Sequence, residues 1–316
     1  MTSQNLNGRI AHSIYPLKKL LIMKLTEALD TFIQYITDQK RAPSTITAYS
    51  KDIEQLNNYL DIEEKVTSIV GISTEQLNNY IKKLKSDKNN SYTLKTISRK
   101  INSMKTYFKF LHSESVINSD PATSVKHPKY TISPPRILTK LEYRALRDVA
   151  RYNTRLFTIV ELLLQTGIRI GELTRLTIDD LNLDGNKKSL TIRVYASNPQ
   201  REVVLNEPAE FALKAYLKQR PEPKEGVNSV FVTKNGNPLL VRNVRTSISR
   251  AFEKTGTQDA TVNDIRNSFI VHQLKSGMPV EVVGAIVGHK RLTSTKKYLK
   301  LVDTNPKRKT TKINPL

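Results

Sequence analysis

The stretch from Thr261 to Tyr298 limits the possible folds of this chain more than any other part of the sequence. Apolar residues recur in it at helical spacing, in three short runs. The runs are separated by residue types that begin or end helices, because they cap free backbone groups or adopt the backbone angles that stop a helix. The predicted caps are Thr261 and Thr293, the predicted first-turn residue is Pro279, and the predicted stops are Gly277 and Gly288. The sequence therefore predicts three short helices that pack through their apolar stripes.

Three polar side chains do not belong to these apolar stripes. Arg266, His289 and Tyr298 fall at helix ends or on polar faces. Side chains in such positions can point into a common cleft, which makes them candidates for a functional site. The alternative is structural: His289 could be a plain helix cap after Gly288, and Tyr298 a packing residue, as most tyrosines are.

Residues 155–181 contain a second pattern of the same kind. A strongly apolar helix is predicted to stop at Gly167, and another helix is predicted to open at about Arg169. An arginine held near a helix N-terminus is well placed to meet an anion, because the free backbone N–H groups there also attract negative charge. Arg169 and Arg266 could instead be ion-pair residues at helix ends, for instance with Glu172.

Together the two stretches resemble the tyrosine recombinase family, also called the phage integrase family. The first box of the family is matched by residues 166–169 and by Glu172, and the second box by residues 265–269, His289 and Tyr298. The matches follow one another in the family's order and spacing. The resemblance implies a mainly α fold with a small antiparallel β-sheet. It also implies a two-domain DNA clamp, in which an N-terminal SAM-like helical core-binding domain precedes an integrase-type catalytic domain.

The resemblance also implies a reaction. Tyr298 would attack a phosphodiester of double-stranded DNA and form a 3′-phosphotyrosyl bond, while Arg169 and Arg266 neutralise the charge that grows on the phosphate. His289 would hydrogen-bond the same phosphate or help to deprotonate the tyrosine. The catalytic residues implied are Tyr298, Arg169, Arg266, His289, Asn263 and Glu172. For Glu172 a structural role in fixing an arginine is the stronger expectation.

Composition agrees with a nucleic-acid partner. The chain has 51 Lys and Arg against 29 Asp and Glu, a formal net charge of +22 that indicates a polyanionic partner. It has no cysteine, which excludes thiol chemistry and disulfides, and its five histidines show no paired metal-ligand spacing. We therefore expect no metal and no cofactor. No apolar run approaches the length of a membrane span, and we expect a cytoplasmic protein associated with the nucleoid.

The chain divides by pattern into five parts. In the second part, helical periodicity predicts four helices over 25–39, 44–60, 74–86 and 91–113. The third part holds four prolines and no sustained period, which is typical of a linker. The predicted parts are a flexible extension (1–22), the core-binding domain (23–115), the linker (116–138), the catalytic domain (139–303) and a basic tail (304–316).

Two helices carry rows of cations that could lie along DNA phosphates. Lysine and arginine bind DNA because they neutralise phosphate charge and release counterions. The alternative interpretation of these cations is a solvated basic surface that makes no contact with DNA. The cations of the fourth helix are Lys95, Arg99, Lys100, Lys105 and Lys109. Those of a later helix, over 240–255, are Arg242, Arg245 and Arg250.

The sequence departs from the family in two places. Residues 181–205 read as a β-hairpin, in whose turn the family places a catalytic lysine. No lysine lies between Ser189 and Val204, and the positions that align best with it are Tyr195 and Ala196. Lys187 and Lys188 lie earlier, and Arg193 and Arg201 flank the turn. The second departure is Asn263, which stands where the family usually has a histidine and which can donate a hydrogen bond but cannot titrate.

Three functions fit these observations. The first is a site-specific recombinase that acts as a tetramer in DNA integration, transposition, excision or co-integrate resolution of a mobile element. The second is a DNA-binding member of the same fold that has lost cleavage, which the two departures would explain. The third is a type IB topoisomerase, which shares the tyrosine chemistry but acts as a monomer.

Overall fold

A computed structural model describes residues 23–87, 92–195, 198–302 and 313–316. The chain separates into two compact units, one ending at Ile132 and the other beginning at Ser133. The boundary falls within the segment for which a linker was predicted. The predictions for residues 1–22, for Ala196 and for most of the basic tail concern residues outside the described part.

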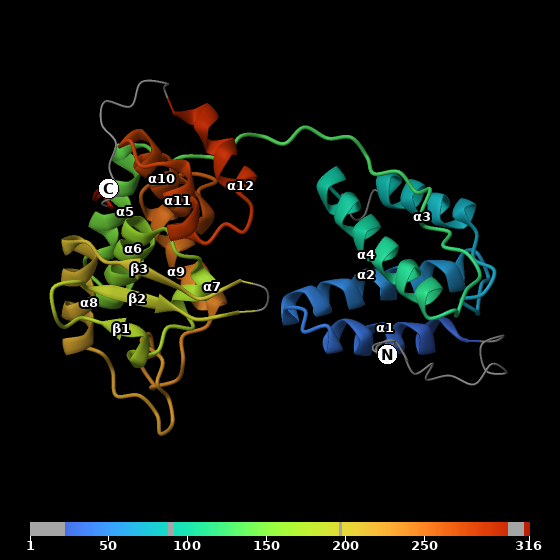
Figure 1. Cartoon of the computed structure of the whole chain (residues 1–316), viewed down its shortest axis with the longest axis horizontal. Helices are drawn as coiled ribbons and strands as arrows, with labels where there is room; N and C mark the ends of the chain where they lie inside the picture. Colours follow the sequence, from blue (N-terminus) through green and yellow to red (C-terminus); the bar gives the residue numbers. More distant parts are fainter. Residues whose placement is uncertain (1–22, 88–91, 196–197, 303–312) are drawn as a thin grey trace, which may run out of the picture. The chain divides into compact units, whose positions relative to one another are not determined.

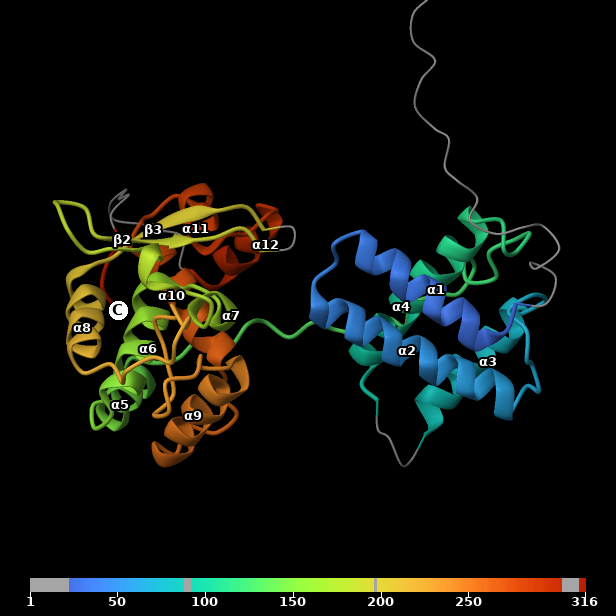
Figure 2. The same cartoon turned by 90° about the horizontal axis from the view of Figure 1, so that it is seen from below.

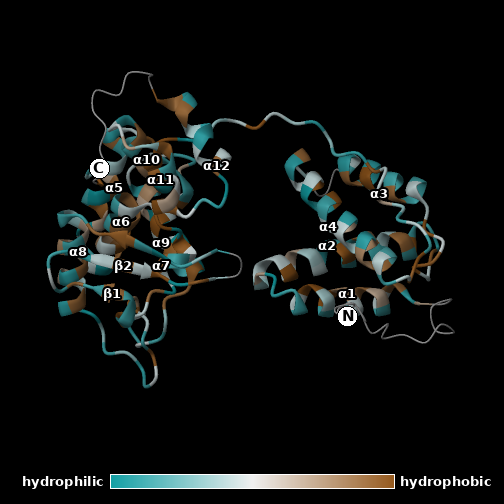
Figure 3. Ribbon diagram, in the orientation of Figure 1, coloured by the Kyte–Doolittle hydropathy of each residue, from teal (hydrophilic) through white to brown (hydrophobic). Residues whose placement is uncertain are grey.

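The first unit is a bundle of four helices. They are α1 (Leu25–Asp38), α2 (Pro43–Ile62), α3 (Thr74–Ser86) and α4 (Leu94–Ser113), and Figures 1 and 2 show them packed side by side. Figure 3 shows hydrophobic and hydrophilic residues alternating along these helices, as amphipathic helices require. Their apolar faces meet around Phe32 and Tyr107, whose rings pack edge to face with centroids 5.2 Å apart. The prediction of four helices is confirmed, with ends displaced by three residues or fewer.

The second unit is mainly helical and contains a small sheet. Its helices are α5 (Lys140–Ala150), α6 (Thr154–Thr166), α7 (Ile170–Leu173), α8 (Glu207–Lys218), α9 (Val241–Lys254), α10 (Val262–Lys275), α11 (Val280–Val287) and α12 (Thr293–Lys296). Short 3-10 helices span Ile178–Asp180 and Lys297–Leu301. Helix α6 lies at the centre, where it packs against α5, α8, α9 and α10, and every residue from Thr158 to Thr166 is buried. Its buried residues are mostly apolar, and the buried polar ones are hydrogen-bonded, for example Glu161 to Arg147 and Thr158 to Ala212 O.

The sheet has three antiparallel strands in the order β1 (Leu181–Asn182), β2 (Ser189–Ile192) and β3 (Arg201–Val204). The predicted hairpin is confirmed as β2 and β3, and β1 adds a strand that was not predicted. Ile192 lies opposite Arg201, so β3 begins beside the end of β2 that leads to the turn.

Two glycines stop helices as the sequence indicated. Gly167 closes α6 with a φ of 61°, and Gly288 closes α11 with a φ of 69°. Both also permit a close approach, because a Cβ at Gly167 would lie 2.2 Å from the ring of Phe269 and one at Gly288 would lie 2.8 Å from the guanidinium of Arg201. Neither position accepts another residue without strain.

Of the other predicted helix signals, those of α10 are confirmed and those at the starts of α11 and α12 are not. Thr261 caps α10, and its hydroxyl and its backbone nitrogen both donate hydrogen bonds to Asp264 Oδ2 at 2.8 Å. Gly277 follows the last turn of α10 with a φ of 87°. Pro279 precedes α11 by one residue instead of lying in its first turn. The prediction that Thr293 caps α12 is wrong, because Leu292 already has helical angles and occupies the capping position.

Candidate active site

Arg169 and Arg266 point their guanidinium groups at three backbone carbonyls, one of which they share. Arg169 Nη1 donates to Val287 O at 3.3 Å and Nη2 to Gly288 O at 2.9 Å. Arg266 Nη2 donates to Val287 O at 2.6 Å, and Nη1 donates to Gly167 O. The two glycine stops therefore bring the two arginines together. Each guanidinium has five N–H groups, and these contacts leave part of them free to bind an anion.

The site concentrates positive charge in a partly buried place. Burial, and after it the nearby charge of Arg169, lower the pKa of Arg266 below its ordinary value. Two guanidinium groups that repel each other favour an anion between them, because it removes the repulsion and accepts their remaining hydrogen bonds. A phosphate oxygen has the charge and geometry for this position.

Glu172 is the counterion that holds the arginines in place. Its carboxylate is buried and accepts from Arg169 N at 2.8 Å and from Arg169 Nη1 at 3.0 Å. Burial alone would raise the pKa of Glu172. The hydrogen bonds from Arg201 and from the backbone of Arg169 outweigh it, together with the charges of both arginines, and the pKa falls to about 2. Glu172 is thus ionised and fully engaged, which fits the structural role expected for it.

Arg201 is a member of this cluster to which the sequence assigned no role. Its Nη1 and Nη2 donate to Glu172 at 3.0 Å and 2.8 Å, and its Nε donates to Ile286 O at 2.8 Å. Its side chain is mostly buried, with 11% of its surface exposed. The sequence showed only an arginine beside a turn, because the strand register and a carboxylate far along the chain decide where it points.

His289 and Tyr298 lie next to each other with nearly parallel rings, 6.4 Å between centroids. His289 Nδ1 lies 2.8 Å from Thr295 Oγ1, which fixes the ring and leaves Nε2 for another partner. Burial, followed by the charges of Arg266 and Arg169, lowers the pKa of His289 to about 4. The imidazole is therefore neutral near pH 7.

Tyr298 is 4% exposed, and its hydroxyl donates to Asn267 Oδ1 at 2.7 Å. Burial raises its pKa, and the opposing effect of Arg266 does not cancel the increase. In this state the phenol is a weak nucleophile.

Asn263 makes no side-chain hydrogen bond with these groups. It occupies the first turn of α10 and is exposed, and no hydrogen bond from its side chain to the described residues is present. A contact with phosphate at this position stays a prediction.

The cations predicted to bind DNA differ in how exposed they are in the structure. Arg242, Arg245 and Arg250 are exposed on α9, and none of them pairs with an acidic group among the described residues. Lys95 and Lys109 are exposed on α4.

The remaining cations of α4 are bound within the first unit. Lys105 Nζ donates to Thr123 O at 3.1 Å, and Arg99 pairs with Asp52. Lys100 is 7% exposed and its Nζ donates to Asp52 Oδ1 at 3.0 Å. This corrects the prediction for Lys100, which satisfies a buried carboxylate and is not available to DNA.

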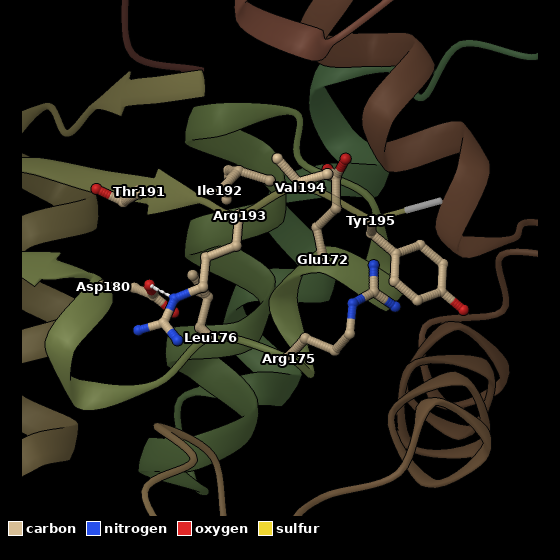
Figure 4. A pocket seen from close by; sticks show the side chains of 9 residues that line it. All are labelled: Glu172, Arg175, Leu176, Asp180, Thr191, Ile192, Arg193, Val194 and Tyr195. Atoms are coloured by element: carbon tan, nitrogen blue, oxygen red, sulfur yellow. Dashed lines mark hydrogen bonds and ion pairs between the residues drawn. The ribbon is translucent and has the colours of Figure 1, made fainter. Parts of the chain in front are cut away.

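A cavity of about 240 Å³ lies beside the hairpin turn, between β2 and the segment that follows α7 (Figure 4). On one side of it the guanidinium of Arg175 stacks on the ring of Tyr195, 3.7 Å from the ring centroid. Figure 4 shows Arg193 on the other side of the cavity, turned toward Asp180, with which it forms an ion pair.

The two lysines considered as substitutes for the hairpin lysine lie elsewhere. Lys187 Nζ pairs with Glu202 Oε2 at 2.9 Å, and Lys188 Nζ donates to Gly185 O. Both precede β2, at the opposite end from the turn, and a strand rises roughly 3.3 Å per residue. Of the named candidates, Tyr195 is the one beside the turn.

In the part of the chain that the structure describes, no group of three or more His, Asp or Glu residues could hold a metal ion. No described helix has both the length and the apolar character that a membrane span requires.

Two family models match most of the chain. Residues 136–305 match the phage integrase family, and residues 29–115 match the phage integrase N-terminal SAM-like domain. Among curated relatives, a tyrosine recombinase XerC of Listeria monocytogenes serotype 4b is 28% identical over 278 residues, covering 84% of this chain and 90% of the relative. A tyrosine recombinase XerD of Rickettsia bellii is 26% identical over 314 residues, covering 92% and 99%.

Solved structures with the same fold include two DNA complexes. The Tn1549 transposon integrase in complex with a circular intermediate DNA aligns with a TM-score of 0.70 at 20% identity, covering 87% of this chain and 94% of that one. A lambda integrase dimer bound to a core site aligns with a TM-score of 0.69 at 16% identity, covering 91% and 81%. At these identities the likeness concerns the fold, and it agrees with the predicted mainly helical architecture with a small antiparallel sheet.

Proposed function

This chain belongs to the phage integrase family of tyrosine recombinases, enzymes that break and rejoin DNA, and we propose that Tyr298 is its nucleophile and that Arg169, Arg266 and His289 bind the phosphate it attacks. The observation that carries the proposal is the convergence of both arginines on the carbonyls of Val287 and Gly288, next to the stacked rings of His289 and Tyr298. Arg201 and Glu172 position the arginines and do not touch the phosphate.

The proposed reaction conserves the phosphodiester bond energy. The phenol of Tyr298 loses its proton as its oxygen forms a bond to phosphorus, the bond from phosphorus to the 5′-oxygen breaks, and the departing oxygen takes up one proton, so that no net proton is consumed. Arg169 and Arg266 stabilise the negative charge that grows on the non-bridging oxygens. His289, with Nδ1 engaged by Thr295, offers Nε2 to the same phosphate. Attack by a 5′-hydroxyl on the phosphotyrosine then rejoins the strand.

The substrate we propose is double-stranded DNA at a specific recombination site. The net charge of +22 and the exposed arginines of α9 support a polyanionic partner. Two of the solved structures that share the fold are integrases in complex with DNA. Reciprocal exchange between two duplexes needs four active sites, so we propose a tetramer that assembles on DNA in the cytoplasm.

The biological role that we favour is recombination of a mobile element, in integration, excision or co-integrate resolution. The fold shared with the Tn1549 integrase supports it, while the XerC and XerD relatives point to site-specific exchange in general. The second candidate is a DNA-binding protein without cleavage activity. The exposed Asn263, which cannot titrate, and the missing hairpin lysine favour it.

One experiment separates the two candidates. The protein is incubated in EDTA with fragments of the genome that encodes it, denatured, and the DNA that stays covalently attached is sequenced. A recombinase yields fragment ends at a discrete site, each with a 3′-phosphotyrosyl bond and a 5′-hydroxyl. Retention of no DNA after denaturation, despite specific binding before it, would establish the silent DNA-binding candidate.

A further inference from the structure

The hydroxyl of Tyr298 has a partner whose orientation is set by a different part of the chain. Asn267 Oδ1 accepts from Tyr298 at 2.7 Å. The amide nitrogen of Asn267 donates to Arg136 O at 3.2 Å and to Asp264 Oδ1 at 3.3 Å. An amide nitrogen has two hydrogens, and each has an acceptor here. The amide oxygen is consequently the atom that faces the tyrosine.

This orientation determines the protonation state of the phenol. A carbonyl oxygen can only accept a hydrogen bond, so Tyr298 must donate and must keep its proton. A phenolate would place a negative charge 2.7 Å from the amide oxygen and would be disfavoured. Asn267 thus binds the neutral form of the proposed nucleophile and opposes the reactive form.

The position of the Arg136 carbonyl is itself fixed by several contacts. Arg136 Nη2 donates to Glu142 Oε1 at 2.6 Å, and its Nη1 donates to Gln258 O. Two residues later, Leu138 N donates to Ser268 Oγ at 2.7 Å. The segment that enters the second unit is therefore docked on α10 beside Asn267, and its Arg136 carbonyl and the Asp264 carboxylate together hold the amide in one orientation.

Charged groups also surround the phenol. Arg266 lowers the pKa of Tyr298 and Asp264 raises it, both from α10. Lys297 lies with its Nζ 5.0 Å from the centre of the tyrosine ring, and the stacked imidazole of His289 is neutral near pH 7. None of these groups contacts the phenolic oxygen. Among the described residues, Asn267 is the hydrogen-bond partner of that oxygen.

We propose that Asn267 is a positioning residue that keeps Tyr298 protonated, because its amide is held by the Arg136 carbonyl and the Asp264 carboxylate with its oxygen toward the phenol. Half a turn of the amide would give up the hydrogen bond to Arg136 O and place the amide oxygen against the Asp264 carboxylate, so both acceptors keep the amide oxygen on the phenol. This inference rests on the proposed role of Tyr298 as nucleophile. It adds a residue that sets how readily the phenol loses its proton.

The test measures single-turnover cleavage of a suicide duplex by the full chain at saturating DNA. Asn267→Ala removes the acceptor, and we expect adduct formation about two- to tenfold faster, the factor to which one net hydrogen bond corresponds. We also expect the pH–rate profile to shift to lower pH. Asn267→Asp retains an acceptor and adds negative charge, so we expect slower cleavage and a profile shifted to higher pH.

A matched control is Asn228→Ala, which truncates an amide whose partner is Asp179, and which should leave rate and profile unchanged. A merely structural Asn267 would slow both Asn267 variants without moving the pH profile, and that result overturns the inference. Tyr298→Phe is measured in the same series. An adduct formed by Tyr298→Phe means that the proposed nucleophile is wrong, whereas no adduct from Tyr298→Phe with unshifted Asn267 profiles refutes only the role of Asn267.

Discussion

Glu172 accepts hydrogen bonds from both terminal nitrogens of Arg201, at 3.0 Å and 2.8 Å. The pair joins β3 to the first turn of α7, and the Nε of Arg201 extends the contact to Ile286 in α11. Three segments that carry the candidate active site therefore meet at one buried ion pair.

Arg201→Ala should destabilise the protein strongly, because it leaves a buried carboxylate with part of its donors gone. Removing one partner of a buried pair typically costs about 3–5 kcal/mol, and urea unfolding would measure it. Lys187→Ala is the matched control, since its pair with Glu202 is exposed and should contribute less than about 1 kcal/mol. Equal effects of the two substitutions would contradict the role given to Arg201.

The Glu172 carboxylate should also make stability depend on pH in the acid range. Its pKa of about 2 in the folded protein lies below the ordinary value of 4.5, so its contribution is fully present above pH 4.5. The contribution is lost as the pH falls from there toward 2. The difference in unfolding free energy between wild type and Glu172→Gln should therefore shrink across this window. A difference that stays constant down to about pH 2.5 would show that the carboxylate is not held in its ionised form.

The exposed arginines of α9 should bind DNA phosphates. Arg242→Ala and Arg245→Ala should each weaken DNA binding and reduce the slope of log affinity against log salt by about 0.9 for each phosphate that the variant no longer neutralises. Arg151→Ala is a suitable control, because this exposed arginine at the C-terminal end of α5 already pairs with Asp148. Salt slopes that are the same in all three variants and in the wild type would mean that α9 does not face DNA.

The missing hairpin lysine leads to a prediction about the leaving oxygen. Lys187 and Lys188 lie at the far end of β2, so their alanine variants should cleave ordinary DNA as the wild type does. Tyr195→Phe should cleave it more slowly, by up to about 10²-fold if the hydroxyl supplies the proton. A substrate with a 5′-bridging sulfur needs no proton on its leaving group and should restore the rate of Tyr195→Phe. A slow Tyr195→Phe variant that this substrate does not rescue would exclude Tyr195 as the acid.

Local signals explain which parts of the fold were predictable. The stops at Gly167 and Gly288 were predicted because glycine, which has no Cβ, adopts a positive φ without strain. The burial of Lys100 could not be predicted, because it depends on Asp52 in another helix. The pairing of Arg201 with Glu172 could not be predicted either, because the two residues belong to different elements, β3 and α7. Motif order indicated the two arginines, His289 and Tyr298 as a group, yet it could not show that the phenol faces Asn267. That hydrogen bond depends on tertiary packing around α10.

The central claim is that Tyr298 becomes covalently attached to DNA. The most direct measurement is digestion of the trapped protein–DNA adduct with protease and nuclease, followed by mass spectrometry of the modified peptide, in parallel with the Tyr298→Phe variant. We predict a nucleotide attached to Tyr298 and, for Tyr298→Phe, DNA binding of unchanged affinity with no adduct. A nucleotide on any other residue, or an adduct formed by Tyr298→Phe, would contradict the account.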